Sequence, residues 1–427
     1  MSVRRDGQGD AGPGAGGDSW GTRAERAQDA LTAEFGTRLR RGGLRNTAPW
    51  RLRQAFAFNY WWLAHAIEVR VDAFERSGHA DALGSARRIL ELVRRRNGGT
   101  LVNDYFDDMG WMAIALLRLH AASGERRFLD DAIGLWEHIG RAGRTAGHGA
   151  AVAWRAQQLD YENAPTNGAF ALLSARLFAV TGDAAHARAA QEAVDWIETT
   201  LIDPATGILA DGVNRLGDGR IDTAWVFSYN QGLYVGALVE MAGWTGWTDR
   251  ERGAGRAAGA GTEAGRAAGA GAGAGRAAGA EAGAGAADRT EGVGGALAGD
   301  QALARAERTA VAAVQLLAPN GVITGENSRL DQRGGGDIGL FKGIFVRYVG
   351  ELIARLPRES EGRPVLVEFV RASTDALWSG IRRSPDVRAG DDWSRPAPPV
   401  TFLSTQLSAV MALETRARLE RGGLMDG

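Results

Sequence analysis

Two adjacent aspartates, Asp107 and Asp108, are the residues of this chain best suited to chemistry. They stand in the run NDYFDDMGW at 103–111, where a polar stretch passes into a strongly apolar one. Hydrolysis of a glycosidic bond uses two carboxyl groups, one that attacks or stabilises the reacting carbon and one that transfers a proton. Asp is also a favoured helix N-cap, so a structural interpretation of the pair stays open at this point.

The spacing of the pair suits a retaining hydrolase. Such enzymes hold their two carboxyl groups ~5–5.5 Å apart. Consecutive Cα atoms are ~3.8 Å apart, so the side chains of Asp107 and Asp108 reach that separation if they diverge slightly. Crowding two carboxylates also raises the pKa of one, which keeps an acid protonated near neutrality.

The elements that must position these residues are helical, because strand signals are nearly absent. Hydrophobic periodicity predicts twelve helices, at 19–36, 52–76, 79–97, 108–123, 125–142, 164–181, 184–201, 229–246, 299–317, 338–356, 364–383 and 402–420. The even-numbered helices are apolar nearly all round, which is typical of helices buried on every side. The odd-numbered helices are amphipathic and belong at the surface.

Connection lengths alternate in the same way. Links from an even to an odd helix are mostly tight, and links from an odd to an even helix are about ten to twenty-five residues long. Six buried helices that alternate with six surface helices predict an all-α fold, the (α/α)6 barrel, with every long loop on one face.

Two segments are expected outside the barrel core. Residues 1–18 form a Gly-rich charged tail, and residues 249–300 form a degenerate Gly/Ala/Arg/Glu repeat that cannot bury enough apolar area to order itself. We therefore expect a single catalytic domain at 19–420, interrupted by a disordered insert at 249–300. By the alternation of loops, the insert leaves from the face opposite Asp107 and Asp108, so a short linker should replace it with little loss of activity.

Further polar and aromatic motifs precede the even-numbered helices and therefore meet at one end of the barrel. Amides, carboxylates and aromatic rings together suit a sugar, whose hydroxyls need hydrogen bonds and whose C–H faces contact rings. We assign substrate contacts to Tyr105, Trp111, Asn163, Asn167, Asp211, Tyr229, Asn230, Gln231, Phe341 and Lys342. Taken singly, the asparagines at 163 and 167 are also compatible with helix caps, and Asp211 with a turn.

These motifs resemble, in order, those of glycoside hydrolase family 76, the endo-α-1,6-mannanases. The similar segments are NDYFDDMGWMAIAL, YENAPTN, DGVN, SYNQGLYVGAL and FKGIFVRY, spread over roughly residues 50–415 apart from the insert. The resemblance implies an (α/α)6 barrel, a mannan-type polysaccharide substrate and a retaining mechanism without metal or cofactor. It makes Asp107 the nucleophile and Asp108 the acid/base. The chain departs from the family pattern at Met109, Met112 and Glu162.

Composition limits the other partners. The formal net charge of −1 gives no field that favours nucleic acid, and the absence of Cys excludes a thiolate site. No segment approaches 18 uncharged apolar residues, so we expect no membrane span, and the N-terminus has no apolar signal region, which predicts a cytoplasmic protein. We expect a monomer.

Two alternative functions remain. A sugar epimerase uses the same barrel but needs His as acid and base, and of the six His only His148 lies in a long loop and His65 on a buried helix. A non-catalytic glycan-binding protein would keep the groove without turnover. Release of reducing ends from α-1,6-mannan separates these possibilities.

Lys342 is the only lysine among fifty basic residues. It lies between Phe341 and Gly343 at the start of an apolar helix, on the face of the long loops. We predict that its compact ammonium binds sugar hydroxyls or holds the aspartate pair ionised, and that Arg in its place lowers kcat/KM at least tenfold, about 1.4 kcal/mol, with little change in melting.

Overall fold

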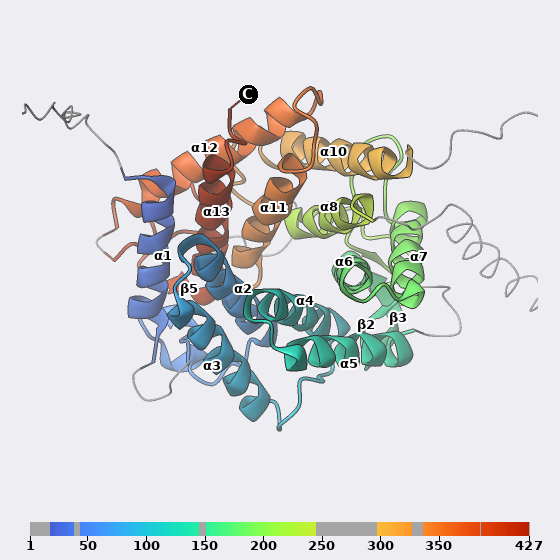
Figure 1. Cartoon of the computed structure of the whole chain (residues 1–427), viewed down its shortest axis with the longest axis horizontal. Helices are drawn as coiled ribbons and strands as arrows, with labels where there is room; N and C mark the ends of the chain where they lie inside the picture. Colours follow the sequence, from blue (N-terminus) through green and yellow to red (C-terminus); the bar gives the residue numbers. More distant parts are fainter. Residues whose placement is uncertain are drawn as a thin grey trace, which may run out of the picture.

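The computed structural model describes residues 18–37, 43–144, 151–244, 297–326, 336–384 and 386–426. These residues are mostly helical (Figure 1). Their helices are α1 (Trp20–Phe35), α2 (Tyr60–Ser77), α3 (Ala80–Arg96), α4 (Phe106–Ser123), α5 (Arg126–Ala142), α6 (Ala164–Thr181), α7 (Ala184–Thr200), α8 (Ser228–Ala242), α10 (Leu297–Leu317), α11 (Ile338–Ile353), α12 (Arg363–Ile381) and α13 (Leu403–Arg421).

The helices form two concentric layers (Figure 1). In the inner layer α2, α4, α6, α8, α11 and α13 each pack against the next, and α13 packs against α2, so the ring is closed. The outer helices α3, α5, α7, α10 and α1 cover α2, α4, α6, α8 and α13 respectively, and α12 packs against α10, α11 and α13. The all-α double ring predicted from the alternating hydrophobicity is confirmed.

The largest error in the predicted boundaries concerns the second helix. We expected it to begin at residue 52, but α2 begins at Tyr60 and is preceded by a single 3-10 turn, η1 (Leu52–Gln54). Leu52 is 64% exposed and Phe56 is 83% exposed, so the apolar residues that imitate a helical pattern here face solvent instead of a core. Without a surface to pack against, so short a segment does not sustain a helix.

The predicted N-terminal tail and insert lie almost entirely outside the described residues. The prediction that the insert leaves from the face opposite the aspartates concerns these residues and stays a prediction. At their edges the boundaries shift slightly. Asp18 accepts a 2.7 Å hydrogen bond from Arg26, and residues 297–300 already belong to α10.

Three of the short links share one local cause. Gly78, Gly124 and Gly182 end α2, α4 and α6 in the left-handed conformation, with φ of 72°, 73° and 70°. A residue with a Cβ rarely adopts this conformation, whereas Gly does so without strain. Each inner helix therefore stops sharply, and the next outer helix starts two residues later.

The long loops contain short strands that were not predicted. Strands β2 (Ala153–Arg155), β3 (Gln158–Asn163) and β4 (Gly212–Val213) form an antiparallel sheet in the order β2-β3-β4. Strands β1 (Thr47–Ala48) and β5 (Thr401–Phe402) pair the first long loop with the last one. The first three residues of the segment YENAPTN, expected as loop, are thus the end of β3, and its last four begin α6 at the predicted residue 164.

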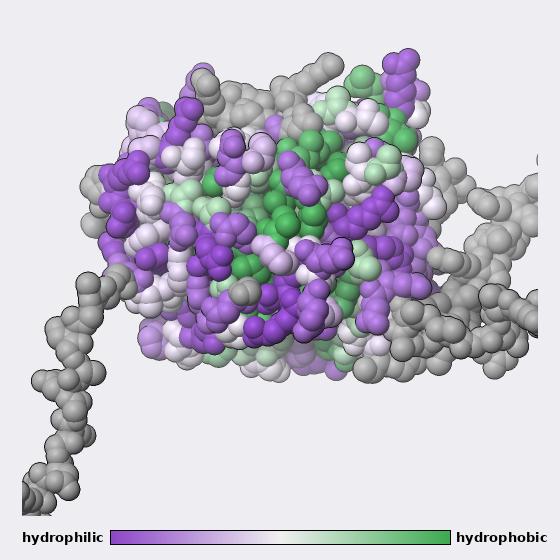
Figure 2. All heavy atoms as spheres, turned by 90° about the horizontal axis from the view of Figure 1, so that it is seen from above, coloured by the Kyte–Doolittle hydropathy of each residue, from purple (hydrophilic) through white to green (hydrophobic). Residues whose placement is uncertain are grey.

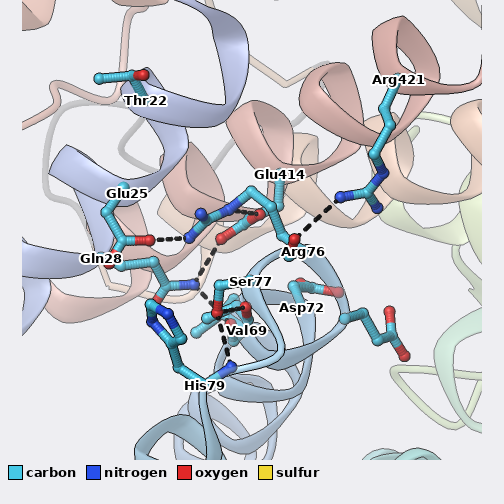
Figure 3. Close-up of polar contacts among 12 residues, drawn as sticks. Thr22, Glu25, Gln28, Val69, Asp72, Arg76, Ser77, His79, Glu414 and Arg421 are labelled. Atoms are coloured by element: carbon cyan, nitrogen blue, oxygen red, sulfur yellow. Dashed lines mark hydrogen bonds and ion pairs between the residues drawn. The ribbon is translucent and has the colours of Figure 1, made fainter.

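A network of ion pairs and hydrogen bonds joins the first helix, α1, and the last helix, α13, to α2 on the face of the short links (Figure 3). Arg76 of α2 donates a 2.8 Å hydrogen bond to Glu414 of α13 and pairs with Glu25 of α1. Gln28 donates to the second oxygen of Glu414 at 3.0 Å, and Arg421 donates to the carbonyl of Arg76 at 3.2 Å. The first and last helices are held to α2, which completes the barrel.

The side of the molecule that lies uppermost in Figure 1 is mainly hydrophilic, and hydrophobic residues gather near its middle (Figure 2). This distribution fits amphipathic outer helices that turn their polar faces to solvent. Among the helices of the described part, none has the length and apolar character needed to cross a bilayer.

Candidate active site

A cleft of about 430 Å³ opens where the inner helices begin, on the face of the long loops. Its walls combine aromatic rings with carboxylates and amides. The lining residues are Phe58, Asn59, Tyr60, Trp61, Tyr105, Asp107, Asp108, Trp111, Trp154, Tyr161, Asn163, Pro165, Asp211, Arg215, Trp225, Phe227, Tyr229, Asp337 and Phe341. The long loops thus meet around one cleft, as their shared face predicted.

The aspartate pair lies in the first turn of α4, behind which the apolar residues Met109 and Trp111 are buried. The N-cap of this helix is Tyr105, and no side chain caps it. Neither aspartate is therefore the N-cap that the structural interpretation required. Both carboxylates line the cleft instead, at the positive end of the helix dipole.

Asp107 accepts two hydrogen bonds. Its Oδ1 receives the backbone N–H of Asp108 at 2.9 Å, and its Oδ2 receives the indole N–H of Trp154 at 3.2 Å. Burial raises the pKa of Asp107 to about 7, and the two hydrogen bonds oppose this shift because they stabilise the ionised form. The carboxylate is accordingly held in place while it keeps an oxygen edge towards the cleft.

Asp108 has a different environment. Its Oδ2 accepts a 3.0 Å hydrogen bond from the amide of Asn103. Burial and then the charge of Asp107 raise the pKa of Asp108 well above its usual range. Adjacent carboxylates in unequal surroundings separate into an ionised member and a protonated one, which is the arrangement that acid/base chemistry needs.

The unpredicted β2-β3-β4 sheet provides one wall of the cleft. Trp154 on β2 lies between Tyr105 and Tyr161, at ring-centroid distances of 5.4 and 5.8 Å, and both contacts are edge-to-face. The guanidinium of Arg155 lies 4.5 Å from the Trp154 ring. These contacts fix the indole that hydrogen-bonds Asp107. Trp154 was not among the predicted substrate contacts.

A second polar cluster stands beside β4. Asp211 accepts hydrogen bonds from Asn230 at 2.8 Å and from Tyr161 at 3.1 Å, and it pairs with Arg215. Arg215 also binds Asp222 at 2.8 Å. Burial raises the pKa of Asp211, and Arg215 opposes the shift. The predicted site residue Asp211 is thus part of the cleft, and its cationic partner, Arg215, lies in the turn that follows it.

The floor of the cleft is aromatic. Tyr229 and Phe341 stack with centroids 3.9 Å apart and an interplanar angle of 14°. Trp61, from the first turn of α2, contacts Tyr229, Phe341 and Trp111 at 6.5, 6.2 and 6.3 Å. Trp111, Tyr229 and Phe341 were predicted from their motifs, whereas Trp61 was not.

Asp337 is a fourth carboxylate of the cleft, besides Asp107, Asp108 and Asp211, and it was also missed. It is the residue before α11, and its Oδ1 accepts the indole N–H groups of Trp61 and Trp62, both at 2.9 Å. Its charge contributes to the raised pKa of Asp107 and of Asp108. The only sequence signal was its place directly after the run of Gly at 334–336 and directly before an apolar helix, which equally suits a cap.

Three predicted amides lie outside the lining of the cleft. Asn167 accepts from the backbone N–H of Val152 at 2.8 Å and donates to its carbonyl at 2.9 Å. Gln231 holds Leu209 in the same manner, at 3.0 and 2.9 Å. Asn230 is buried and supports Asp211. These side chains anchor the long loops to the first turns of α6 and α8, so they position the site without facing it. Asn163, by contrast, lines the cleft and also caps α6.

Lys342 does not line the cleft either. It is 2% exposed, its ammonium donates to the carbonyl of Asp391, and it lies 5.6 Å from the ring of Trp393. Burial lowers the pKa of Lys342, and the charges of Asp391 and Glu326 oppose that shift. The side chain therefore packs behind Phe341, against the loop that precedes β5. Its uniqueness in the composition indicated a special environment, but that environment is the protein interior.

A larger hollow of about 560 Å³ lies on the outside between α5 and α7. It is lined by Trp136, Phe170 and Arg144 among others, and Arg144 is paired there with Glu192 at 3.0 Å. We take the smaller cleft as the candidate active site, because that cleft contains the adjacent aspartates.

Comparisons with known proteins show the family of the chain. The model of glycosyl hydrolase family 76 matches residues 19–260. The Lin0763 protein from Listeria innocua is 30% identical, with a TM-score of 0.75 over 95% of this chain and 99% of that chain. The GH76A α-1,6-mannanase from Salegentibacter sp. HEL1_6 is 28% identical, with a TM-score of 0.73 over 94% of this chain and 100% of that chain.

An inactive variant of the Salegentibacter enzyme, in which two consecutive aspartates are replaced by Asn, has been solved with α-1,6-mannotriose. It is 27% identical to this chain, with a TM-score of 0.72 over 94% of this chain and 100% of that chain. A search of curated proteins gives no match.

Proposed function

The chain belongs to glycosyl hydrolase family 76, and we propose that it is a retaining hydrolase of α-1,6-mannan in which Asp107 and Asp108 carry out the reaction. Glycoside hydrolysis is the activity of the family, and the proposal adds the linkage, the stereochemistry and the roles of the two residues. The observation that carries it is the aspartate pair itself. Two partly buried carboxylates with different hydrogen-bond partners stand side by side at the base of an aromatic cleft.

In the first step the carboxylate of Asp107 attacks the anomeric carbon while Asp108 gives its proton to the departing glycosidic oxygen. The glycosidic bond breaks, and an ester forms between the sugar and Asp107. In the second step Asp108 takes a proton from water, the water oxygen attacks the anomeric carbon, and the ester breaks. Two inversions leave the α configuration unchanged.

The surroundings of the two aspartates support Asp107 as the nucleophile and Asp108 as the acid/base, rather than the reverse. Asp107 accepts hydrogen bonds from Trp154 and from the Asp108 N–H, and both stabilise a carboxylate that must attack. The pKa of Asp108 is raised further by the charge of Asp107, so Asp108 retains the proton that it must give. The departure of Met109 from the family pattern leaves both carboxylates in the cleft.

The lining of the cleft supports a mannan substrate. Tyr105, Trp111, Tyr229 and Phe341 offer ring surfaces to sugar C–H groups, and Asn163 and Asp211 offer polar atoms to hydroxyls. Three solved structures similar to this chain are of an α-1,6-mannanase, and two of these are complexes with α-1,6-mannotriose or α-1,6-mannotetrose.

The test is hydrolysis of α-1,6-mannan and of α-1,6-mannotetraose, followed by release of reducing ends and by NMR of the first product. We expect an initial α anomer, and an initial β anomer would overturn the retaining mechanism. Asp107→Asn and Asp108→Asn should each fold and lose at least 10²–10⁴-fold in turnover. Asp104→Asn, an exposed neighbour outside the cleft, is the matched control and should remain active.

Azide separates the two roles. With an activated mannoside, azide should rescue Asp108→Ala by replacing water at the sugar–Asp107 ester, and the product should be the α-mannosyl azide. Rescue of Asp107→Ala should instead give the β-mannosyl azide, because only one inversion occurs. The opposite pattern would exchange the roles of the two residues, and a protein that binds mannotetraose without cleaving it would be a glycan-binding module.

A further inference from the structure

Asp337 connects two inner helices that do not follow one another in the ring. It stands at the start of α11, while Trp61 and Trp62 belong to the first turn of α2, and both helices pack on α13. A single carboxylate oxygen accepts both indole N–H groups at 2.9 Å. The contact spans 275 residues of sequence and closes the ring at the level of the cleft.

The two indoles diverge from this shared oxygen. Trp62 is buried and meets the ring of Phe402 edge-on at 6.4 Å, next to the β1-β5 pair. Trp61 points into the cleft, where it touches Trp111 of α4 and Tyr229 of α8 as well as Phe341. Trp61 therefore joins the parts of the aromatic floor that different helices contribute, and its orientation depends on the hydrogen bond that Asp337 accepts.

Asp337 also adds charge to the cleft. It is an exposed residue that lines the cleft with Asp107 and Asp108, and its negative charge raises the pKa of both, after the larger effect of burial. A carboxylate beside the pair opposes ionisation of the second member, which favours the singly protonated state that the reaction uses.

We propose that Asp337 is a positioning residue of the hydrolytic site: it holds Trp61 and Trp62 through Oδ1, and its charge helps the aspartate pair to keep one proton. The inference rests on the proposed function, since the pair must work as nucleophile and acid. It assigns no contact between Asp337 and the reacting carbon.

Other titratable groups surround the cleft and stay unchanged in the test. They are Tyr60 and His65 on α2, Tyr105 before α4, Tyr161 on β3, Asp211 and Arg215 beside β4, and Tyr229 on α8. Burial raises the pKa of Tyr60, Tyr161 and Tyr229 and lowers that of His65. Asp337 can therefore be varied alone.

Two substitutions separate the two parts of the role. Asp337→Asn keeps an oxygen acceptor for the indoles and removes the charge. Asp337→Ala removes both. Asp104→Asn removes an exposed carboxylate near the pair that lies outside the cleft, and it is the control.

The charge is tested by the pH dependence of kcat/KM on α-1,6-mannotetraose. Asp337→Asn should move both limbs of the bell-shaped pH profile to lower pH, because the loss of a negative charge favours ionisation of the pair. The shift should be about half a pH unit for a charge several ångströms away across a solvated cleft. A merely structural role would lower kcat/KM at every pH and leave the limbs in place. Unmoved limbs in Asp337→Asn would overturn the electrostatic part.

The hydrogen bonds are tested by NMR of ¹⁵N-labelled indoles, with Trp61 and Trp62 assigned from their Phe variants. Asp337→Ala should shift these two N–H signals and leave the other indoles unchanged, and it should raise KM at least several-fold. Unshifted signals for Trp61 and Trp62 would overturn the positioning part.

These readouts remain informative if mannan hydrolysis is not found. Titration of the ¹³Cγ signals of Asp107 and Asp108 reports the effect of the Asp337 charge without turnover, and the indole signals report the hydrogen bonds. A wild-type protein that fails to cleave mannan would contradict the proposed function. Unchanged carboxyl titration in Asp337→Asn, or unchanged indole signals in Asp337→Ala, would contradict the inference about Asp337.

Discussion

The indole N–H of Trp154 donates to Oδ2 of Asp107 across 3.2 Å, and this bond attaches strand β2 to the first turn of α4. The donor comes from a sheet that is absent from the simple double ring of helices. The long loop before α6 is therefore more than a connection: it delivers the side chain that orients one of the two aspartates.

Trp154→Phe should lower kcat/KM by about tenfold, roughly 1.4 kcal/mol of transition-state stabilisation. The hydrogen bond from Trp154 lowers the pKa of Asp107, so its loss should move the acidic limb of the pH profile to higher pH. Trp136→Phe is the matched control, because Trp136 donates to Ser174 at 2.8 Å in the outer layer of the barrel. An unchanged acidic limb in Trp154→Phe would show that this bond does not act on the ionised aspartate.

Ionisation of the buried aspartate pair should lower the free energy of unfolding as pH rises to neutrality and above. Burial raises the pKa of Asp107 to about 7 from an ordinary value near 3.8. An acid whose pKa is raised in the folded state stabilises the protein fully below the unfolded pKa, and this stability is lost as pH rises through the folded pKa. The loss should therefore develop between about pH 4 and pH 7.

Asp107→Asn and Asp108→Asn should consequently melt at a higher temperature than the parent at pH 8. Their free energy of unfolding should exceed that of the parent by about 1 kcal/mol or more. The difference should disappear at pH 4, where the parent carboxyls are protonated. Thermal melts across this range test the prediction, with Asp104→Asn as the control that should show no such convergence. Parent and variants that melt together at both pH values would contradict the raised pKa.

The fold and the site were predictable to different extents. The barrel followed from hydrophobicity because each helix carries its own pattern, and Asp107 and Asp108 were found because they are adjacent. Asp337 and Trp61 meet only when the ring closes, so no local pattern relates them. The strands were missed because β2, β3 and β4 are short and contain the same polar residues as the loops around them.

The amides show a second limit. Asn167 and Gln231 were selected because polar residues at the start of buried helices suit a sugar, yet they bind the backbone of Val152 and Leu209. A buried amide satisfies a loop carbonyl and a hydroxyl equally well, so residue type alone does not distinguish these partners. Only the position of the side chain relative to the cleft does.

The ion pair beside β4 supports a prediction about stability. Arg215 is paired with the buried Asp211 and with Asp222, and its guanidinium lies 4.8 and 4.4 Å from the rings of Tyr161 and Trp225. Arg215→Gln should destabilise the protein by about 2 kcal/mol, since it leaves a buried carboxylate without its cation in a partly solvated cluster. Urea unfolding measures the change.

Arg220→Gln is the control in the same loop. The Arg220 side chain is 86% exposed, and its nearest oxygen on Asp218 is 3.7 Å away, so its loss should change stability by no more than about 0.5 kcal/mol. Equal effects of the two substitutions would mean that the Arg215 cluster contributes no more than an ordinary surface pair.

Lys342 gives the last prediction, which reverses the one made from sequence. The ammonium is buried against the carbonyl of Asp391 and the ring of Trp393, and it is absent from the lining of the cleft. A guanidinium is larger and planar, so Lys342→Arg overfills this space and should destabilise the protein by about 1–3 kcal/mol. Well below its melting temperature the variant should keep kcat/KM within a few-fold of the parent.

Lys342→Met provides the comparison, because it keeps much of the length of the side chain and removes the donor. It should also melt early, since the carbonyl of Asp391 loses its buried partner. Melting curves and kcat/KM are measured on the same preparations. If Lys342→Arg melts like the parent and loses tenfold in kcat/KM, the ammonium acts on the substrate after all. If it melts early and remains active, the solitary lysine was selected by the shape and charge of the interior behind Phe341.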